Sequence, residues 1–193
     1  MKLLCGVGHN DKTRPAKING LPLRQYTLWT TMLQRCYDDK LQQKQKSYIG
    51  CSVSDAFLSY TFFYDLCGLE FGFNAKDEDG KSWQLDKDLL IRGNKVYSEN
   101  TCCFLPAKLN MLLQSGSCRP DPKSCGVVLT SCSTYQAQCS VNGKAVYLGT
   151  FKTQEAAYET YKKFKEGLIK RFTTDNFNLL SDKHLDALIG YIL

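Results

Sequence analysis

Histidine is scarce in this chain of 193 residues, which contains only His9 and His184. Its ten cysteines form no C-x-x-C pair, the spacing that marks many zinc sites. Four of them recur every seven residues: Cys118, Cys125, Cys132 and Cys139. This spacing matches no known ligand pattern, so we expect reduced cysteines that act as small apolar residues, and no structural zinc.

Long apolar runs are also absent. The first residues, MKLLCGVGHNDKTR, contain an apolar run that is too short for a signal peptide. Without secretion, disulfides are not expected. No other run reaches the roughly 20 apolar residues of a membrane-spanning helix. A cytoplasmic protein with no membrane partner is therefore expected.

Charge is unevenly distributed along the chain, whose net charge is +6. Basic residues dominate 1–50 and 123–171, whereas acidic residues dominate 51–80. Two basic regions that flank an acidic middle fit a polyanionic partner, and solvated lysine faces are the alternative. An apolar content of 43% is enough for one compact domain or two small ones.

Residues 126–166 contain three short strand patterns that run into one amphipathic helix. Apolar and polar residues alternate in the middle strand, which predicts a sheet with one buried and one exposed face. The predicted buried side consists of Tyr135, Ala137, Cys139 and Val141. Asn142-Gly143 predicts a hairpin turn, and Thr153 predicts a helix N-cap. The helix residues expected to cover the sheet are Ala157, Tyr161, Phe164 and Leu168.

This stretch resembles the AP2 DNA-binding domain in three motifs: Tyr135-x-Ala137, Tyr147-Leu148-Gly149-Thr150-Phe151 and Glu155-Ala156-Ala157. The resemblance implies that the exposed sheet face enters the major groove of double-stranded DNA. That face would carry Val128, Thr130, Gln136, Gln138, Ser140, Ala145 and Tyr147. Gln136 and Gln138 would read adenine edges, while Lys144 and Lys152 would hold phosphates. Plant AP2 domains carry arginines on this face and this chain does not, so a polar face without a ligand is the alternative.

The segment 83–113 is the candidate for chemistry. Its pattern predicts a strand over 83–89, a loop around Gly93-Asn94, a short strand, and a helix from about Pro106. Asp86 and Asp88 are two residues apart, so a strand would project both to one face. Asn110, on the following helix, would point back at them. In ββα-metal nucleases such an arrangement holds one divalent ion, which neutralises the scissile phosphate.

Upstream, RQYTLWTTMLQRCY predicts a helix over 24–37, and a second helix is expected near Asp55. Together with the central segment, this region resembles the HNH endonuclease family, especially phage-encoded versions with a downstream AP2 module. The further matching motifs are GVGHND, Trp29-x-x-Met32-Leu33-x-Arg35-Cys36-Tyr37 and Tyr48-x-Gly50-Cys51-x-Val53. The resemblance implies Mg²⁺ or Mn²⁺ bound by Asp86, Asp88 and Asn110. It also implies further DNA contacts from Arg92, Asn94 and Lys95.

Two family positions differ in this chain. Lys87 occupies the position of the catalytic histidine, and Thr101 occupies that of the middle asparagine. Lysine is a poor general base at neutral pH, so Lys87 is assigned to phosphate binding or to stabilising a leaving group. Two interpretations stay open: a metal-dependent DNA endonuclease or nickase that uses Asp86, Lys87, Asp88 and Asn110, and an inactive HNH fold that binds DNA or inhibits a host protein. Exposed aspartates that pair with Lys87 or Arg92 are the structural alternative.

The expected architecture is α+β in three parts. An HNH-like ββα-metal domain with N-terminal helices occupies 1–115, an AP2-like three-stranded antiparallel sheet on a helix occupies 123–171, and a helical tail occupies 172–193. The tail should form a helix from Ser181 or Asp182, with Leu185, Leu188, Ile189 and Ile192 as its apolar stripe. A helix this short is only marginally stable by itself. We therefore expect it to pack on the rest of the chain or on a second copy of the chain in a homodimer. The expected partner is double-stranded DNA, in the host-cell cytoplasm if the protein is viral.

Overall fold

A computed structural model describes residues 3–114, 121–141 and 143–191. Three residues of the motifs above, Cys118, Asn142 and Ile192, lie outside the described residues. The chain mixes helices with small sheets, so the predicted α+β class is confirmed. It forms two compact units, residues 1–107 and 108–193, and the C-terminal tail belongs to the second.

The first unit opens with a small hairpin of β1 (Lys17–Ile18) and β2 (Leu21–Pro22). The helix α1 (Arg24–Tyr37) follows, with the bounds that the sequence predicts. Its buried stripe consists of Trp29, Met32, Leu33 and Cys36. The chain then turns through α2 (Asp39–Lys44) and the 3₁₀ turn η1 (Lys46–Tyr48).

The helix α3 (Tyr60–Leu69) packs against α1 within this unit. It starts later than predicted, because Ala56–Leu58 form a 3₁₀ turn, η2, and Ser59 caps the helix instead. The Ser59 hydroxyl accepts the N–H of Phe62 at 3.3 Å. The interface is aromatic: the rings of Trp29 and Tyr60 lie 5.4 Å apart, and Trp29 Nε1 donates a 2.8 Å hydrogen bond to the Phe57 carbonyl.

Two strand pairs complete the first unit. The strands β3 (Ser52–Val53) and β5 (Val96–Tyr97) pair in parallel, and β4 (Gln84–Asp86) pairs antiparallel with β6 (Cys103–Leu105). The helix α4 (Ala107–Leu113) follows β6 along the chain. The predicted order of strand, loop, strand and helix is therefore present, but the first strand ends at residue 86 rather than at 89.

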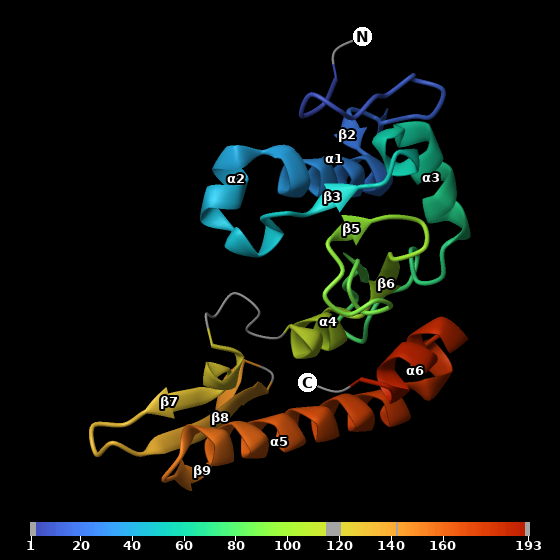
Figure 1. The fold of residues 1–193 in the computed structure, drawn as a ribbon. Coiled ribbons are helices and arrows are strands. Elements are labelled where there is room, and N and C mark those ends of the chain that lie inside the picture. The colour runs from blue at the N-terminus through green and yellow to red at the C-terminus, as the bar shows by residue number, and fades with distance from the viewer. Residues whose placement is uncertain (1–2, 115–120, 142, 192–193) are drawn as a thin grey trace. The chain divides into compact units, whose positions relative to one another are not determined.

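The second unit contains the predicted sheet and helix. The strands β7 (Val127–Leu129), β8 (Tyr135–Val141) and β9 (Lys144–Phe151) form an antiparallel sheet in that order, after the 3₁₀ turn η3 (Pro122–Ser124). The long helix α5 (Gln154–Asp175) runs along one face of this sheet (Figure 1). Val141 pairs with Lys144, which is the register that the predicted hairpin requires. The predicted N-cap is confirmed, since Thr153 Oγ1 accepts the N–H of Ala156 at 3.3 Å.

The buried stripe of α5 differs from the prediction. Phe164 and Leu168 are only half-buried. The buried positions instead recur every fourth residue, at Ala157, Tyr161, Lys165, Ile169 and Thr173. Lys165 is 5% exposed. A lysine stem can cover apolar surface in such a stripe when its ammonium finds partners at the end.

The tail folds back on its own unit through η4 (Phe177–Leu179) and α6 (Asp182–Ile189), which packs on α5. This helix starts where predicted and buries Leu185 and Leu188, so both are covered without a second copy of the chain. His184 belongs to its capping box, where Nδ1 lies 2.7 Å from the Ser181 hydroxyl. Over the described ranges, no helix is both long and apolar enough to cross a membrane.

Candidate nucleic-acid interface and central acidic turn

Asp86 is the last residue of β4, and its side chain holds the turn that follows. Its Oδ1 accepts hydrogen bonds from the backbone N–H groups of Asp88 (3.0 Å) and Leu89 (2.8 Å). Such side-chain acceptors compete with a strand's ladder for the backbone, so the strand stops here. The prediction that Asp86 and Asp88 share a strand face was wrong for this reason. Burial, and secondarily the Asp88 carboxylate, raise the pKa of Asp86 to about 6.

Lys87, at the position of the family's histidine, points into the first unit. Its side chain is only 9% exposed. Its ammonium donates to Asp88 Oδ2 at 3.1 Å and to the Asn94 carbonyl at 3.2 Å, and it lies 5.8 Å from the centre of the Tyr97 ring. These contacts make Lys87 a structural cation of the turn. They also match the alternative in which an aspartate pairs with Lys87.

The loop after the turn is held by its own side chains. Asn94 Nδ2 donates to the carbonyls of Lys87 and Val96, both at 2.6 Å, and its Oδ1 accepts the N–H of Val96 at 3.1 Å. Thr101 is buried, and its hydroxyl donates to the same Val96 carbonyl at 2.7 Å. The amide of Asn94, predicted to contact DNA, is thus engaged by backbone groups of the loop.

Arg92 and Lys95 are the exposed cations of this loop. The Lys95 ammonium donates a 2.8 Å hydrogen bond to the Ser47 carbonyl, which ties the loop to the segment after α2. An exposed side chain with one surface hydrogen bond can still reach a phosphate, so the predicted DNA contacts of Arg92 and Lys95 stay predictions.

A divalent ion at the turn would meet a competing cation. Asp86 and Asp88 are of the donor type that Mg²⁺ prefers, but Asp88 already faces the Lys87 ammonium. Asn110 lies on α4 in the second unit, so its meeting with Asp86 stays a prediction. In the part of the chain that the structure describes, no group of three or more His, Cys, Asp or Glu side chains is placed to hold a metal ion.

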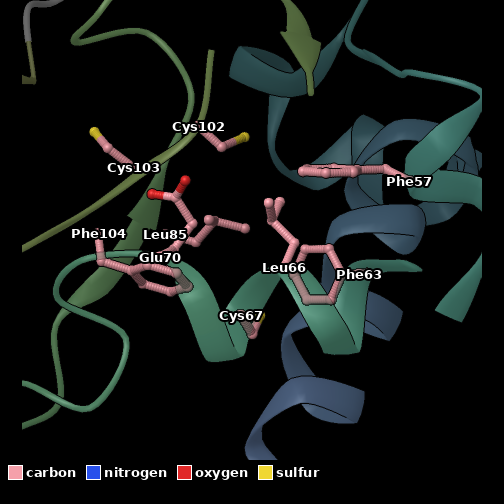
Figure 2. Close-up of a pocket in the computed structure, with 9 residues that line it drawn as sticks. All are labelled: Phe57, Phe63, Leu66, Cys67, Glu70, Leu85, Cys102, Cys103 and Phe104. Atoms are coloured by element: carbon pink, nitrogen blue, oxygen red, sulfur yellow. The ribbon is translucent and has the colours of Figure 1, made fainter. Parts of the chain in front are cut away.

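A small interior gap lies beside β4 and β6 in the first unit. It is lined by Phe57, Phe63, Leu66, Cys67, Glu70, Leu85, Cys102, Cys103 and Phe104 (Figure 2). Its volume of about 10 Å³ holds at most one water molecule, so it is not a substrate site. The sulfurs of Cys102 and Cys103 point in opposite directions (Figure 2). Burial raises the pKa of Cys67 and of Cys102 to about 12, so both stay protonated thiols.

The sheet of the second unit has one face that α5 leaves open. On the covered face, Val127 and Ala137 pack against Ala157 of the helix. The pairing register places the following residues on the other face: Val128, Gln136, Gln138, Ser140, Ala145, Tyr147 and Thr150. We call these seven residues the open face. Six of them are those that the sequence predicts, whereas Thr130 lies just beyond β7, 2.7 Å from Thr134 between their hydroxyl oxygens.

A bulge in β9 brings Thr150 to the open face. Ala137 pairs with Gly149 and Gln138 with Tyr147, so Leu148 is an extra residue in β9. Gly149 has φ +132°, a conformation that glycine tolerates and other residues rarely adopt. Simple alternation would turn Tyr147 and Thr150 to opposite faces. The bulge instead aligns them, and their hydroxyl oxygens lie 3.0 Å apart. A glycine inside a strand was the sequence signal for this bulge.

Cations lie at both ends of β9. Lys144 begins the strand and Lys152 follows its last residue, and both are exposed. Lys123, in contrast, forms an ion pair with Glu155, with 3.5 Å between its ammonium nitrogen and the carboxylate oxygen. The two lysines therefore lie at the two ends of the open face, and the side chains of the open face itself carry no charge. Positive charge lies at the edges of this surface, and hydrogen-bonding groups lie between.

Comparisons of the chain with protein-family models, with curated proteins and with solved structures found no match.

Proposed function

We propose that this chain binds double-stranded DNA through the open face of the β7–β9 sheet, as an AP2-like unit. The observation that carries the proposal is the uncovered row of carboxamide and hydroxyl groups on a sheet whose other face is packed on α5. A narrow sheet of this kind is one of the elements that the major groove admits.

The open face supplies two kinds of contact in this proposal. Gln136 and Gln138 lie on the central strand and present amides that can pair with adenine edges. Tyr147, 61% exposed, and its neighbour Thr150 add hydroxyl groups beside them. Lys144 and Lys152 hold phosphates at the two ends of β9. This division matches the general rule that phosphate contacts position a protein and base contacts give specificity.

The test is fluorescence anisotropy of the full chain with a labelled duplex of mixed sequence, over a series of salt concentrations. Each lysine that contacts phosphate should contribute about 0.9 to the slope of log K against log salt. The variants Lys144→Gln and Lys152→Gln should each lower this slope. Lys170→Gln is the matched control, because Lys170 is an exposed lysine of α5, the helix on the opposite face.

A second pair of variants separates the open face from general charge. Gln136→Ala and Gln138→Ala should weaken binding while leaving the salt slope unchanged, because neither residue is charged. Equal effects of Lys170→Gln and Lys152→Gln would refute binding through this face. Absence of any binding to the duplex at low salt would refute the proposal as a whole and favour a protein partner.

A second candidate function is metal-dependent cleavage of that DNA by an HNH-like segment, with Asp86, Asp88 and Asn110 as metal ligands. The antiparallel pair of β4 and β6 followed by α4 favours it, as does the fixed position of the Asp86 carboxylate. The ion pair between Lys87 and Asp88 counts against it. Binding is therefore the first proposal and cleavage the second.

Cleavage is tested with supercoiled plasmid and Mg²⁺ or Mn²⁺. Asp86→Asn should abolish nicking if Asp86 binds the metal. Asp77→Asn is the matched control, because Asp77 Oδ1 also accepts two backbone N–H groups of a turn, those of Asp79 (3.0 Å) and Lys81 (2.9 Å). Equal loss of nicking in both variants would indicate a folding effect. Intact plasmid with the unaltered chain would leave a binding protein without this activity.

A further inference from the structure

The open face contains side chains that pair with adenine and lacks the arginine and lysine that read guanine. Its seven residues include two carboxamides, those of Gln136 and Gln138. In the major groove a glutamine pairs with adenine through N6 and N7, whereas arginine or lysine pairs with guanine through O6 and N7. Within the described ranges, no hydrogen bond to the protein holds either carboxamide, so both can turn toward a base. The residue types of this face therefore favour adenine.

Gln136 lies between two side chains that carry methyl groups. It pairs with Val128 of β7 on one side and with Thr150 of β9 on the other. Paired residues on one face of a sheet have Cβ atoms about 4.5–5.5 Å apart, so these three side chains form one row across the strands. Val128 is 45% exposed, and Thr150 is exposed as well. The row thus presents a carboxamide and methyl groups side by side.

An A·T base pair presents the complementary groups together. Adenine N6 and N7 and the 5-methyl group of thymine share the major-groove edge of one base pair, whereas a G·C pair has no methyl group there. A carboxamide can pair with the adenine while a neighbouring aliphatic side chain covers the methyl group of the thymine. Such a contact removes apolar surface of both partners from water, which is favourable.

We propose that the open face selects A·T base pairs, with Gln136 pairing with an adenine and Val128 covering the methyl group of the partner thymine. This inference rests on the DNA-binding function proposed above and adds the base composition of the target. Gln138 reads a second adenine in the same way, beside Tyr147, its partner in β9. The lysines at the ends of β9 contact phosphates and do not distinguish the bases.

The first experiment separates the two grooves of the duplex. Fluorescence anisotropy of the full chain is measured with four labelled duplexes of equal length, whose base pairs are A·T, G·C, diaminopurine·T or inosine·C. A diaminopurine·T pair has the major-groove edge of A·T and the minor-groove amino group of G·C, and an inosine·C pair is the reverse. The A·T duplex avoids runs of adenine, which narrow the minor groove. The A·T and diaminopurine·T duplexes should bind about tenfold more tightly than the other two.

The second experiment tests the contact with the thymine methyl group. Deoxyuridine in place of thymidine removes this group and keeps every hydrogen-bonding atom of the base pair. It should weaken binding by about four-fold for each methyl group that is covered. Val128→Ala should remove most of the difference between the two duplexes. Leu129→Ala should keep it and is the matched control, because Leu129 is an exposed aliphatic residue of the same strand that alternation turns to the other face.

The variant Gln136→Ala isolates the adenine contact. It should lower the affinity for the A·T duplex and leave that for the G·C duplex unchanged, which a folding defect would not do. Equal affinity for all four duplexes, or affinity that follows the minor groove, would overturn the inference and leave DNA binding through the lysines standing. Equal binding of the thymidine and deoxyuridine duplexes would overturn the role of Val128. Absence of binding to every duplex would overturn the proposed function together with the inference.

Discussion

The Lys87 ammonium lies 3.1 Å from the Asp88 carboxylate, with the lysine side chain 9% exposed and the aspartate side chain 49% exposed. The same ammonium donates to the Asn94 carbonyl at 3.2 Å. A cation in this position holds the turn after β4 together from inside. The role of Lys87 is therefore tested first by measuring the free energy of unfolding.

Lys87→Met keeps the aliphatic stem but removes both hydrogen bonds. It should lower the free energy of unfolding by about 1–3 kcal/mol, because the part-buried Asn94 carbonyl loses its partner. Urea unfolding followed by circular dichroism measures this. Lys40→Met is the control, since Lys40 is an exposed lysine of α2 and its substitution should change stability by less than about 0.5 kcal/mol. If the unfolding midpoint stayed constant while DNA binding weakened, Lys87 would be a phosphate ligand instead.

Gly126 and Gly143 differ in what surrounds them, although both have positive φ. A Cβ at residue 126 would lie 2.1 Å from the Tyr161 ring, whereas a Cβ at residue 143 meets nothing within 4 Å. Gly126→Ala should therefore destabilise by about 2–4 kcal/mol, from backbone strain and overpacking together. Gly143→Ala should cost only about 1 kcal/mol of backbone strain. Thermal unfolding of both variants decides this, and equal losses would contradict the close packing at residue 126.

Local patterns explain which elements were predictable. The apolar spacing at Trp29, Met32, Leu33 and Cys36, with Pro22 just upstream, fixes α1 to its observed bounds. The alternation in β8 likewise predicts which face α5 covers, because both signals depend only on near neighbours in the sequence. Six of the seven open-face residues are among those predicted from the sequence, by alternation or by the AP2 resemblance.

The remaining features depend on contacts that sequence patterns do not encode. The prediction of a strand that continues through Asp88 was wrong, because the Asp86 side chain accepts hydrogen bonds from two backbone N–H groups. The burial of Lys165 depends on the Gln114 carbonyl, far away in the sequence. Pairing between β3 and β5 is parallel and long-range, so no turn signal predicts it.

Gly167 lies inside α5 and offers a substitution expected to stabilise the second unit. It is exposed, and a Cβ there would meet nothing within 4 Å. Gly167→Ala should raise the free energy of unfolding by up to about 1 kcal/mol, because alanine restricts the unfolded chain and favours the helix. The unfolding midpoint in urea measures the gain. A loss of stability would contradict the exposure of residue 167 and the open space around it.

His184 should make the stability of the second unit depend on pH. Burial, with a smaller effect of Lys183, lowers the pKa of His184 from 6.5 to about 4. As pH falls below about 6.5, the unfolded chain takes up the proton before the folded chain does. Stability from this residue is therefore complete above pH 6.5 and is lost as the pH falls toward 4. The full loss is on the order of 3 kcal/mol.

The variant His184→Gln isolates this effect. Glutamine at the same position of a capping box still accepts the N–H of Ser181 and does not titrate. Urea unfolding at pH 7.5 and pH 5 should show a smaller difference for the variant than for the unaltered chain. Asp86, with its raised pKa, titrates in the opposite sense but is present in both proteins, so it cancels in the comparison. Parallel pH dependence of the two proteins would contradict the lowered pKa of His184, because it would mean that this residue is protonated at the same pH in the folded and unfolded states.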